Sequence, residues 1–256
     1  MSKVLVMLSD GMRPDSLINI PECEKMKSQS TYTLNARTVF PSMTLPCHIS
    51  LFHSVTPKEH GTLTNNFVTL EKEVSGIVEV VNANKKTSAL VYSWDKFKDL
   101  TKVCAPDYIY YYRESDRVDH TIEKMTSAAI NFLKEDKPDF MFVYYFSPDY
   151  VGHKLGWMSD EYINAVKQSW VHMQRVMDAA DDDYAIIILA DHGGHEKLHG
   201  YDIDEDMTIP IFIKGKDFEK GKVLSSANII DIAPTIADIL GLEKCEDWKG
   251  QSLLKK

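Results

Sequence analysis

Three short apolar runs, each ending close to an aspartate, constrain the fold of this sequence more than any other feature. The runs are Lys3–Ser9, Asp139–Phe146 and Tyr184–Ala190. Their apolar character, rich in β-branched and aromatic residues, is typical of strands buried on both faces of a parallel sheet. Asp10 and Asp191 directly follow the first and third runs, and Asp149 stands three residues beyond the second. Because ligands bind beyond the carboxyl ends of parallel strands, we expect the three carboxylates to converge on one site.

Segments with helical periodicity alternate with these runs. Helices are expected at Thr121–Leu133, Ser159–Ala180 and Asp231–Leu240, and further strands at Ser88–Tyr92 and Ile209–Lys214. The alternation predicts an α/β fold with three α/β/α layers and a mostly parallel central sheet. A length of 256 residues fits one domain spanning 1–256. Within it, the less regular and aromatic-rich segment 66–120 is a candidate cap or specificity region.

The charge balance and the apolar pattern argue against several classes of partner. The net charge of −9 disfavours binding to nucleic acid or to anionic membranes. The N-terminal apolar run is too short for a signal peptide, and no run of about 18 apolar residues predicts a membrane span. The cysteines, Cys23, Cys47, Cys104 and Cys245, match neither a zinc ribbon nor a disulfide-rich scaffold. We therefore expect a cytoplasmic protein with free thiols, whose oligomeric state the sequence leaves open.

Histidines stand close to two of the three aspartates. They are His153, four residues after Asp149, and His192, His195 and His199, which follow Asp191. Three carboxylates in one cleft would repel one another unless cations lay between them. Ligation by mixed imidazole and carboxylate groups suits zinc, with manganese or iron as alternatives. The sequence therefore predicts a metal site at the strand ends.

A candidate nucleophile lies in the segment FPSMTLPCH, residues 40–48. Thr44 precedes Leu45–His53, which can form a helix that tolerates Pro46 in its first turn. The start of a helix offers free N–H groups and a positive dipole end, which together favour a phosphoryl oxygen. By this reasoning alone Ser42 is a rival nucleophile, and Thr44 could equally be an ordinary helix N-cap.

Taken together, these motifs resemble the alkaline phosphatase superfamily, above all its nucleotide pyrophosphatase/type I phosphodiesterase branch. The resembling phrases are FPSMTLPCH, SPDYVGH, ADHGG, HGYD and DIAPTIADILGL, with Ser147 in place of the family's usual glutamate. The resemblance implies that Thr44, rather than Ser42, is the nucleophile and that Asn65 contacts a phosphate oxygen. It assigns Asp149, His153 and His199 to one metal, preferring His199 to His195. It assigns the other metal to Asp10, Thr44, Asp191 and His192.

The resemblance also implies an activity. We expect an alkaline phosphatase-like catalytic domain with two divalent cations, zinc in the first place or manganese. It would cleave phosphate esters of the phosphodiester or nucleotide pyrophosphate type through a phosphothreonine intermediate. The substrate would be a small phosphorylated molecule, for which a nucleotide is one option. Phosphomonoester or phosphonate hydrolysis and an inactive metal-binding protein remain alternatives. A sulfatase is disfavoured because Cys47 lacks the following proline and arginine of that class, and a phosphoglycerate mutase would need a further domain.

Overall fold

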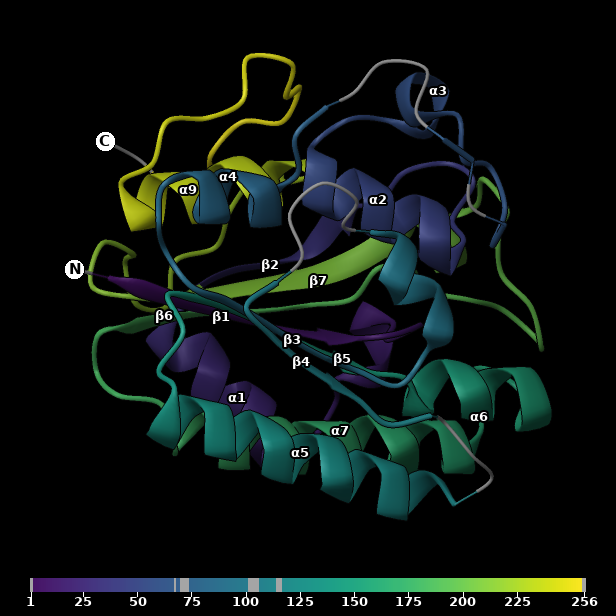
Figure 1. Ribbon diagram of the computed structural model, residues 1–256. Helices are drawn as coiled ribbons and strands as arrows, with labels where there is room; N and C mark the ends of the chain where they lie inside the picture. The colour runs from purple at the N-terminus through teal and green to yellow at the C-terminus, as the bar shows by residue number, and fades with distance from the viewer. Residues whose placement is uncertain (1, 67, 70–73, 101–105, 114–116, 255–256) are drawn as a thin grey trace.

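A central sheet lies between two layers of helices (Figure 1) in the computed structural model, which describes residues 2–66, 68–69, 74–100, 106–113 and 117–254. The sheet has seven strands in the order β2-β7-β6-β1-β5-β3-β4. They are β1 (Lys3–Ser9), β2 (Thr31–Arg37), β3 (Ser88–Tyr92), β4 (Tyr108–Tyr111), β5 (Phe140–Tyr145), β6 (Tyr184–Leu189) and β7 (Thr208–Lys214). β7 runs antiparallel to β6 and β2, and the remaining pairs are parallel. The predicted mostly parallel α/β/α fold is confirmed.

Helices cover both faces of the sheet (Figure 1). The face drawn uppermost carries α2 (Thr44–His53), α3 (Pro57–His60), α4 (Ile77–Ala83) and α9 (Ile232–Leu240). The opposite face carries α1 (Pro21–Gln29), α5 (Val118–Glu135), α6 (Ser147–Leu155) and α7 (Asp160–Met177). The short helix α8 (Asp204–Met207) leads into β7. The ends of the longer helices follow local chemistry: the Ser159 hydroxyl caps α7 by accepting the Tyr162 N–H, and Gly241 ends α9 in the left-handed region.

The three strands predicted to carry aspartates are neighbours at the centre of the sheet. β1 lies between β6 and β5, and their side chains are buried. In the pairing register, Ser9 of β1 stands beside Tyr145, and Leu8 stands beside Leu189. The carboxyl ends of the three strands are therefore level, and the segments that follow them leave the sheet at the same edge.

The segment 66–120 contributes to the sheet in its described part. β3 and β4 are strands of the sheet, and α4 packs beside α9 on one face. Residues 67, 70–73, 101–105 and 114–116 of this segment lie outside the described residues, and Cys104 is among them. Cys23, Cys47 and Cys245 have free thiols.

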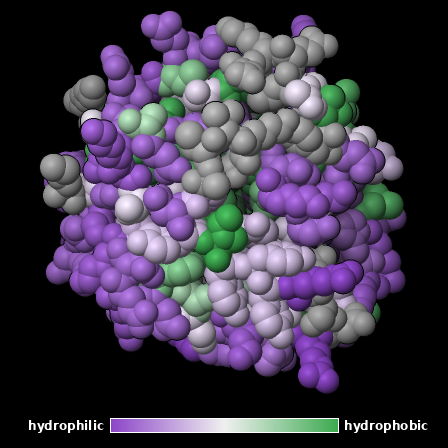
Figure 2. Space-filling view, in the orientation of Figure 1, coloured by the Kyte–Doolittle hydropathy of each residue, from purple (hydrophilic) through white to green (hydrophobic). Residues whose placement is uncertain are grey.

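The surface seen in Figure 2 is largely hydrophilic, and its hydrophobic side chains are scattered in small patches. Within the described ranges, none of the helices is both long enough and apolar enough to cross a membrane.

Candidate active site

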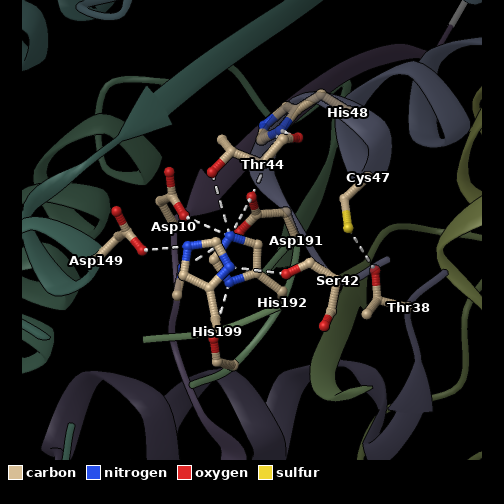
Figure 3. Close-up of polar contacts among 12 residues, drawn as sticks. Asp10, Thr38, Ser42, Thr44, Cys47, His48, Asp149, Asp191, His192 and His199 are labelled. Atoms are coloured by element: carbon tan, nitrogen blue, oxygen red, sulfur yellow. Dashed lines mark hydrogen bonds and ion pairs between the residues drawn. The ribbon is translucent and has the colours of Figure 1, made fainter. Parts of the chain in front are cut away.

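The predicted ligands meet at the carboxyl edge of the sheet, where their side chains point toward one another (Figure 3). Their nitrogen and oxygen atoms form two groups, and within each group the atoms lie within 4.8 Å of one another. The inner group, which is fully buried, is Asp10, Asp191 and His192. The outer group, which is partly exposed, is Asp149, His153 and His199. The groups adjoin, because the rings of His192 and His199 stack at 3.9 Å between centroids.

Local structure explains how each aspartate reaches this edge. Asp10 is the first residue after β1, and Asp191 is the second residue after β6. Asp149 lies in the first turn of α6, where a carboxylate suits the positive end of the helix dipole. His153 follows one turn later on the same face, and its Nε2 lies 3.4 Å from Asp149 Oδ1. Gly11, at a φ of 65°, donates its N–H to Asp191 Oδ1 at 3.2 Å and leaves room for Asp149 close by.

The three histidines of the two ligand groups are held in the same tautomer. Nδ1 lies 2.8 Å from the Gly193 carbonyl in His192, 2.8 Å from the Ser42 carbonyl in His199 and 2.9 Å from the Lys197 carbonyl in His153. Because a carbonyl can only accept, each Nδ1 must carry the proton. In a neutral ring Nε2 then presents a lone pair, which is the arrangement of a metal-binding histidine with its other nitrogen hydrogen-bonded.

The Nε2 lone pairs face carboxylate oxygens. His192 Nε2 lies 3.3 Å from Asp10 Oδ1 and 3.4 Å from Asp191 Oδ2, and His199 Nε2 lies 3.5 Å from Asp149 Oδ1. Burial lowers the pKa of His192 to about 3 and that of His199 to about 2, so both rings are neutral near pH 7. A neutral Nε2 without a proton cannot donate to these oxygens, and a cation between the lone pairs would satisfy both sides.

The buried carboxylates carry an electrostatic cost of their own. Burial, followed by repulsion from Asp191 and Asp149, raises the pKa of Asp10 well above its ordinary value. Burial also raises the pKa of Asp191. Asp10 Oδ1 and Asp191 Oδ2 are buried and accept no hydrogen bond from any described residue. These orphaned oxygens, together with the imidazole and carboxylate donor set, fit divalent cations of the zinc type.

The predicted nucleophile lies beside the inner group. Thr44 Oγ1 is 3.3 Å from His192 Nε2, and the residue is buried. Thr44 is the first residue of α2, and the N-cap position belongs to Met43 without a capping side-chain bond. The alternative interpretation of Thr44 as an ordinary N-cap is therefore wrong. Its hydroxyl stands at the positive end of a ten-residue helix, directed toward the ligand groups (Figure 3).

Asn65 reaches the same place from the loop beyond α3. Its Oδ1 accepts the Leu45 N–H at 3.0 Å, which anchors the side chain to the first turn of α2. Because the amide oxygen is used in this way, the NH₂ group is the donor that Asn65 can offer a ligand. Asn65 and Thr44 line one pocket of about 340 Å³, and the other lining residues are Asp10, Trp94, Tyr144, Phe146, Asp149, Tyr150, His153, Lys154 and His199.

Ser42, the rival nucleophile, and His195, the rival ligand, both make hydrogen bonds to the loop region around His192 and His199. Ser42 Oγ donates to the Tyr201 carbonyl at 3.0 Å. His195 Nδ1 lies 2.7 Å from Asp206 Oδ1, outside both ligand groups. The buried Asp206 also accepts the Tyr201 N–H at 2.9 Å, so its carboxylate joins the two arms of this loop.

Three glycines near the site leave room for neighbouring groups. Gly152, Gly193 and Gly194 do not have a positive φ, so backbone conformation does not require glycine there. A Cβ on Gly152 would lie 2.7 Å from the Trp157 ring, and one on Gly194 would lie 2.3 Å from it. A Cβ on Gly193 would lie 2.0 Å from the Glu205 carbonyl oxygen. They are glycines because other groups pack directly against them.

Sequence reasoning missed the residues that support the ligands. Trp157 donates from Nε1 to the Gly11 carbonyl at 3.0 Å and packs edge-on against His153. The Tyr144 hydroxyl donates to Asp10 Oδ2, which leaves Oδ1 for a ligand. His48, which is fully buried, donates from Nδ1 to the Thr44 carbonyl at 2.7 Å, with Asp191 Oδ2 at 3.5 Å. The i, i+4 spacing of Thr44 and His48 on α2 was the available signal for the last contact.

The sheet and its covering helices form an alkaline phosphatase-like fold. The sequence model of the type I phosphodiesterase/nucleotide pyrophosphatase family matches residues 4–234, so the chain belongs to this family, which is a branch of the alkaline phosphatase superfamily. This family consists of metal-dependent phosphoester hydrolases. The resemblance inferred from the motifs is confirmed.

Solved structures share the fold at low sequence identity. The inactive threonine-to-alanine variant of murine ectonucleotide pyrophosphatase/phosphodiesterase 5, in complex with AMP, is 17% identical with a TM-score of 0.83 and covers 98% of both chains. A phosphonate monoester hydrolase from Silicibacter pomeroyi is 15% identical with a TM-score of 0.75, over 99% of this chain and 76% of its own. Identities this low establish the fold alone.

Curated relatives include phosphoglycerate mutases. The 2,3-bisphosphoglycerate-independent phosphoglycerate mutase of Clostridioides difficile is 32% identical over 140 residues, which is 52% of this chain and 27% of the mutase. The enzyme of the same name from Listeria welshimeri is 28% identical over 139 residues. The match covers about a quarter of the length of these relatives.

Proposed function

We propose that this protein hydrolyses phosphate esters of the phosphodiester or nucleotide pyrophosphate type, with Thr44 as the nucleophile. The observation that carries the proposal is the Thr44 hydroxyl, 3.3 Å from His192 Nε2 at the junction of two ligand groups. A structural relative was solved with AMP, which supports a nucleotide as the substrate.

The ligand set favours two divalent cations, zinc in the first place and manganese as the alternative. Asp10, Asp191 and His192 would hold one of them beside Thr44, and Asp149, His153 and His199 would hold the other. When bound, the cations supply positive charge that favours ionisation of the Thr44 hydroxyl and stabilises the departing oxygen.

The chain itself positions the phosphoryl group. The start of α2 and the NH₂ group of Asn65 present donors to the non-bridging oxygens. Thr44 Oγ1 attacks phosphorus, the bond to the leaving oxygen breaks, and a phosphothreonine forms. Water then attacks this phosphothreonine, which releases the phosphoryl product and returns the hydroxyl to Thr44. His48 donates to the Thr44 carbonyl and lies close to Asp191, and these two contacts keep Thr44 in the same position relative to Asp191 during both steps.

Thr44→Ala tests the proposal against Ser42→Ala, which removes the rival hydroxyl two residues away. Activity would be measured on p-nitrophenyl esters of a phosphate monoester, a phosphate diester and a phenylphosphonate, and on a nucleotide pyrophosphate. Thr44→Ala should lower kcat by about a thousandfold or more while the protein still contains metal. Ser42→Ala should keep activity within a few-fold of the parent. Full activity in Thr44→Ala would exclude this nucleophile, and absence of activity on every ester would favour the inactive metal-binding alternative.

A further inference from the structure

The strand β4 forms one end of the sheet (Figure 1), and among the described strands it has a neighbour, β3, on its inner side only. The opposite end of the sheet differs, because the chain itself covers β2. There the Tyr32 N–H donates to the Lys222 carbonyl, and the Leu224 N–H donates to the Tyr32 carbonyl, both at 2.8 Å. The outer edge of a strand pairs readily with another strand, so the edge of β4 calls for protection or for a partner.

The residues of β4 favour pairing over protection. Tyr108–Tyr111 consists of three tyrosines and one isoleucine, which have a high β-propensity. The strand contains none of the charged residues or prolines that usually discourage pairing at the edge of a sheet. Ile109 and Tyr111 are 49% and 42% exposed, so both side chains would gain burial from a neighbouring strand.

The backbone groups on the outer edge of β4 belong to Ile109 and Tyr111. The Tyr112 N–H donates to the Tyr92 carbonyl of β3 at 3.1 Å. Because backbone groups alternate in direction along a strand, those of Tyr110 also face β3, whereas those of Ile109 and Tyr111 face away from it. Ile109 and Tyr111 therefore present donors and acceptors to a further strand.

The two ends of this segment carry opposite charges. Asp107 directly precedes β4, Arg113 follows it, and both are exposed, as are Ile109 and Tyr111 between them. With the period of two along a strand, these four side chains share one face of the sheet. A second copy that runs antiparallel about Tyr110 would set Asp107 beside Arg113 and Ile109 beside Tyr111. The same register joins the outward-facing backbone groups of Ile109 to those of Tyr111.

We propose that two copies of this chain associate through β4, antiparallel and centred on Tyr110, so that their sheets form one continuous sheet. The interface has a two-fold axis, and each contact therefore occurs twice. An in-register parallel partner would instead place Asp107 beside Asp107, where like charges repel. The contact is small, so we expect a dissociation constant of about 10–100 µM. The association does not depend on the proposed hydrolytic reaction.

Sedimentation velocity of the full chain, at concentrations from about 5 to 500 µM, tests the association. The parent should pass from monomer to dimer over this range. Arg113→Glu should raise the dissociation constant by about tenfold or more, because it sets two carboxylates side by side at each end of the pair. Lys167→Glu, which changes an exposed residue of α7 and alters the net charge equally, should leave the constant within about twofold. A parent that stays monomeric throughout, or an equal effect of both variants, would overturn the proposal.

An exchange of charges between two chains tests the pairing of Asp107 with Arg113. Asp107→Lys should also lose self-association, since it sets two cations side by side. An equimolar mixture of Arg113→Glu and Asp107→Lys should associate again, because each charge then meets its opposite on the other chain. Circular dichroism checks that both variants are folded, since Asp107 also accepts the Ser88 N–H at 2.8 Å. A mixture of folded chains that stays monomeric would contradict this pairing.

A cysteine at the two-fold axis tests the register without any change of charge. Tyr110→Cys would place two thiols in a pair without backbone hydrogen bonds, where the Cα atoms lie about 4.5 Å apart, within the range of a disulfide. Cys104 and Cys245 would first be replaced by serine. Mild oxidation should then link most of the Tyr110→Cys chains into dimers, whereas Tyr108→Cys, two residues from the axis, should stay largely unlinked. Equal linking of the two variants, or none of Tyr110→Cys, would overturn the register.

Discussion

Replacing Asp10 with asparagine should stabilise the metal-free protein and at the same time weaken its hold on metal. Asp10 and Asp191 present oxygens within 4.8 Å of each other in a fully buried group. At that separation two unit charges repel by about 3.5 kcal/mol for an effective dielectric constant of ~20. Part of this repulsion is already relieved by proton uptake, as the raised pKa of Asp10 implies. We therefore expect Asp10→Asn to gain about 2 kcal/mol without metal, which is about 6 °C in Tm for a domain of this size.

The side chain of asparagine keeps the local contacts. Its amide oxygen can still accept the Tyr144 hydroxyl, and its NH₂ group can donate toward Asp191 where the carboxylates now repel. Zinc should stabilise Asp10→Asn less than it stabilises the parent, because the inner group loses a charged ligand in the variant. Each occupied site adds about 2.7 kcal/mol at a free metal concentration of a hundred times Kd. The zinc-induced rise in Tm should therefore be about half as large in the variant as in the parent.

The stabilisation by Asp10→Asn in the absence of metal should depend on pH. The folded-state pKa of Asp10 lies above the ordinary value of 3.8, so the metal-free parent loses stability as pH rises from about 4 through the raised pKa. The advantage of Asp10→Asn should grow over the same window and vanish below it. Calorimetry with chelator or zinc at several pH values measures this, with Asp217→Asn, at an exposed position, as the control. A metal-free variant no more stable than its parent at pH 7 would refute the reasoning.

Two further predictions concern the loop that carries His192 and His199. His199→Gln should lose the outer metal, because His199 Nε2 belongs to the outer group, whereas His195→Gln should retain both metals. Metal analysis after dialysis measures this, and loss of a metal from His195→Gln alone would show that His195 is the ligand. Asp206→Asn should weaken metal binding by about tenfold, because its buried carboxylate positions the loop through His195 and Tyr201; competition with a chromogenic chelator measures the affinity, and an unchanged value would show that the loop needs no such anchor.

The strands at the centre of the sheet were predictable because a strand that is buried on both faces consists almost entirely of apolar residues. β1 and β3 have the predicted bounds, β5 is one residue shorter than predicted at each end, and β6 is one residue shorter at its carboxyl end. β2 was missed because it is the end strand of the sheet, with β7 as its only neighbour among the described strands, because its register shifts between Thr33 and Ala36, and because it mixes buried with exposed residues. α6 was missed because it is short and its residues between Ser147 and Leu155 are mostly polar or small.

The candidate metal ligands were predictable for a different reason. Each lies within a few residues of a strand end or of another ligand, so short phrases such as SPDYVGH and ADHGG contain them. Their supports are far away along the chain: Trp157 binds the carbonyl of Gly11, and Tyr144 binds Asp10. The packing of Trp157 against Gly152 and Gly194 depends on how three separate segments meet, which no local pattern encodes.

Because the two ligand groups are buried to different extents, they should release a bound ion with different ease. Asp10, Asp191 and His192 are closed off from solvent, whereas His153 is 43% exposed at the rim. A cation in the first group could leave only when the centre of the sheet opens, and one in the second could exchange with its surroundings while the fold stays intact. During a shortage of metal the protein would therefore pass through a folded form that holds one ion in the buried group and can take up the second ion again when metal returns.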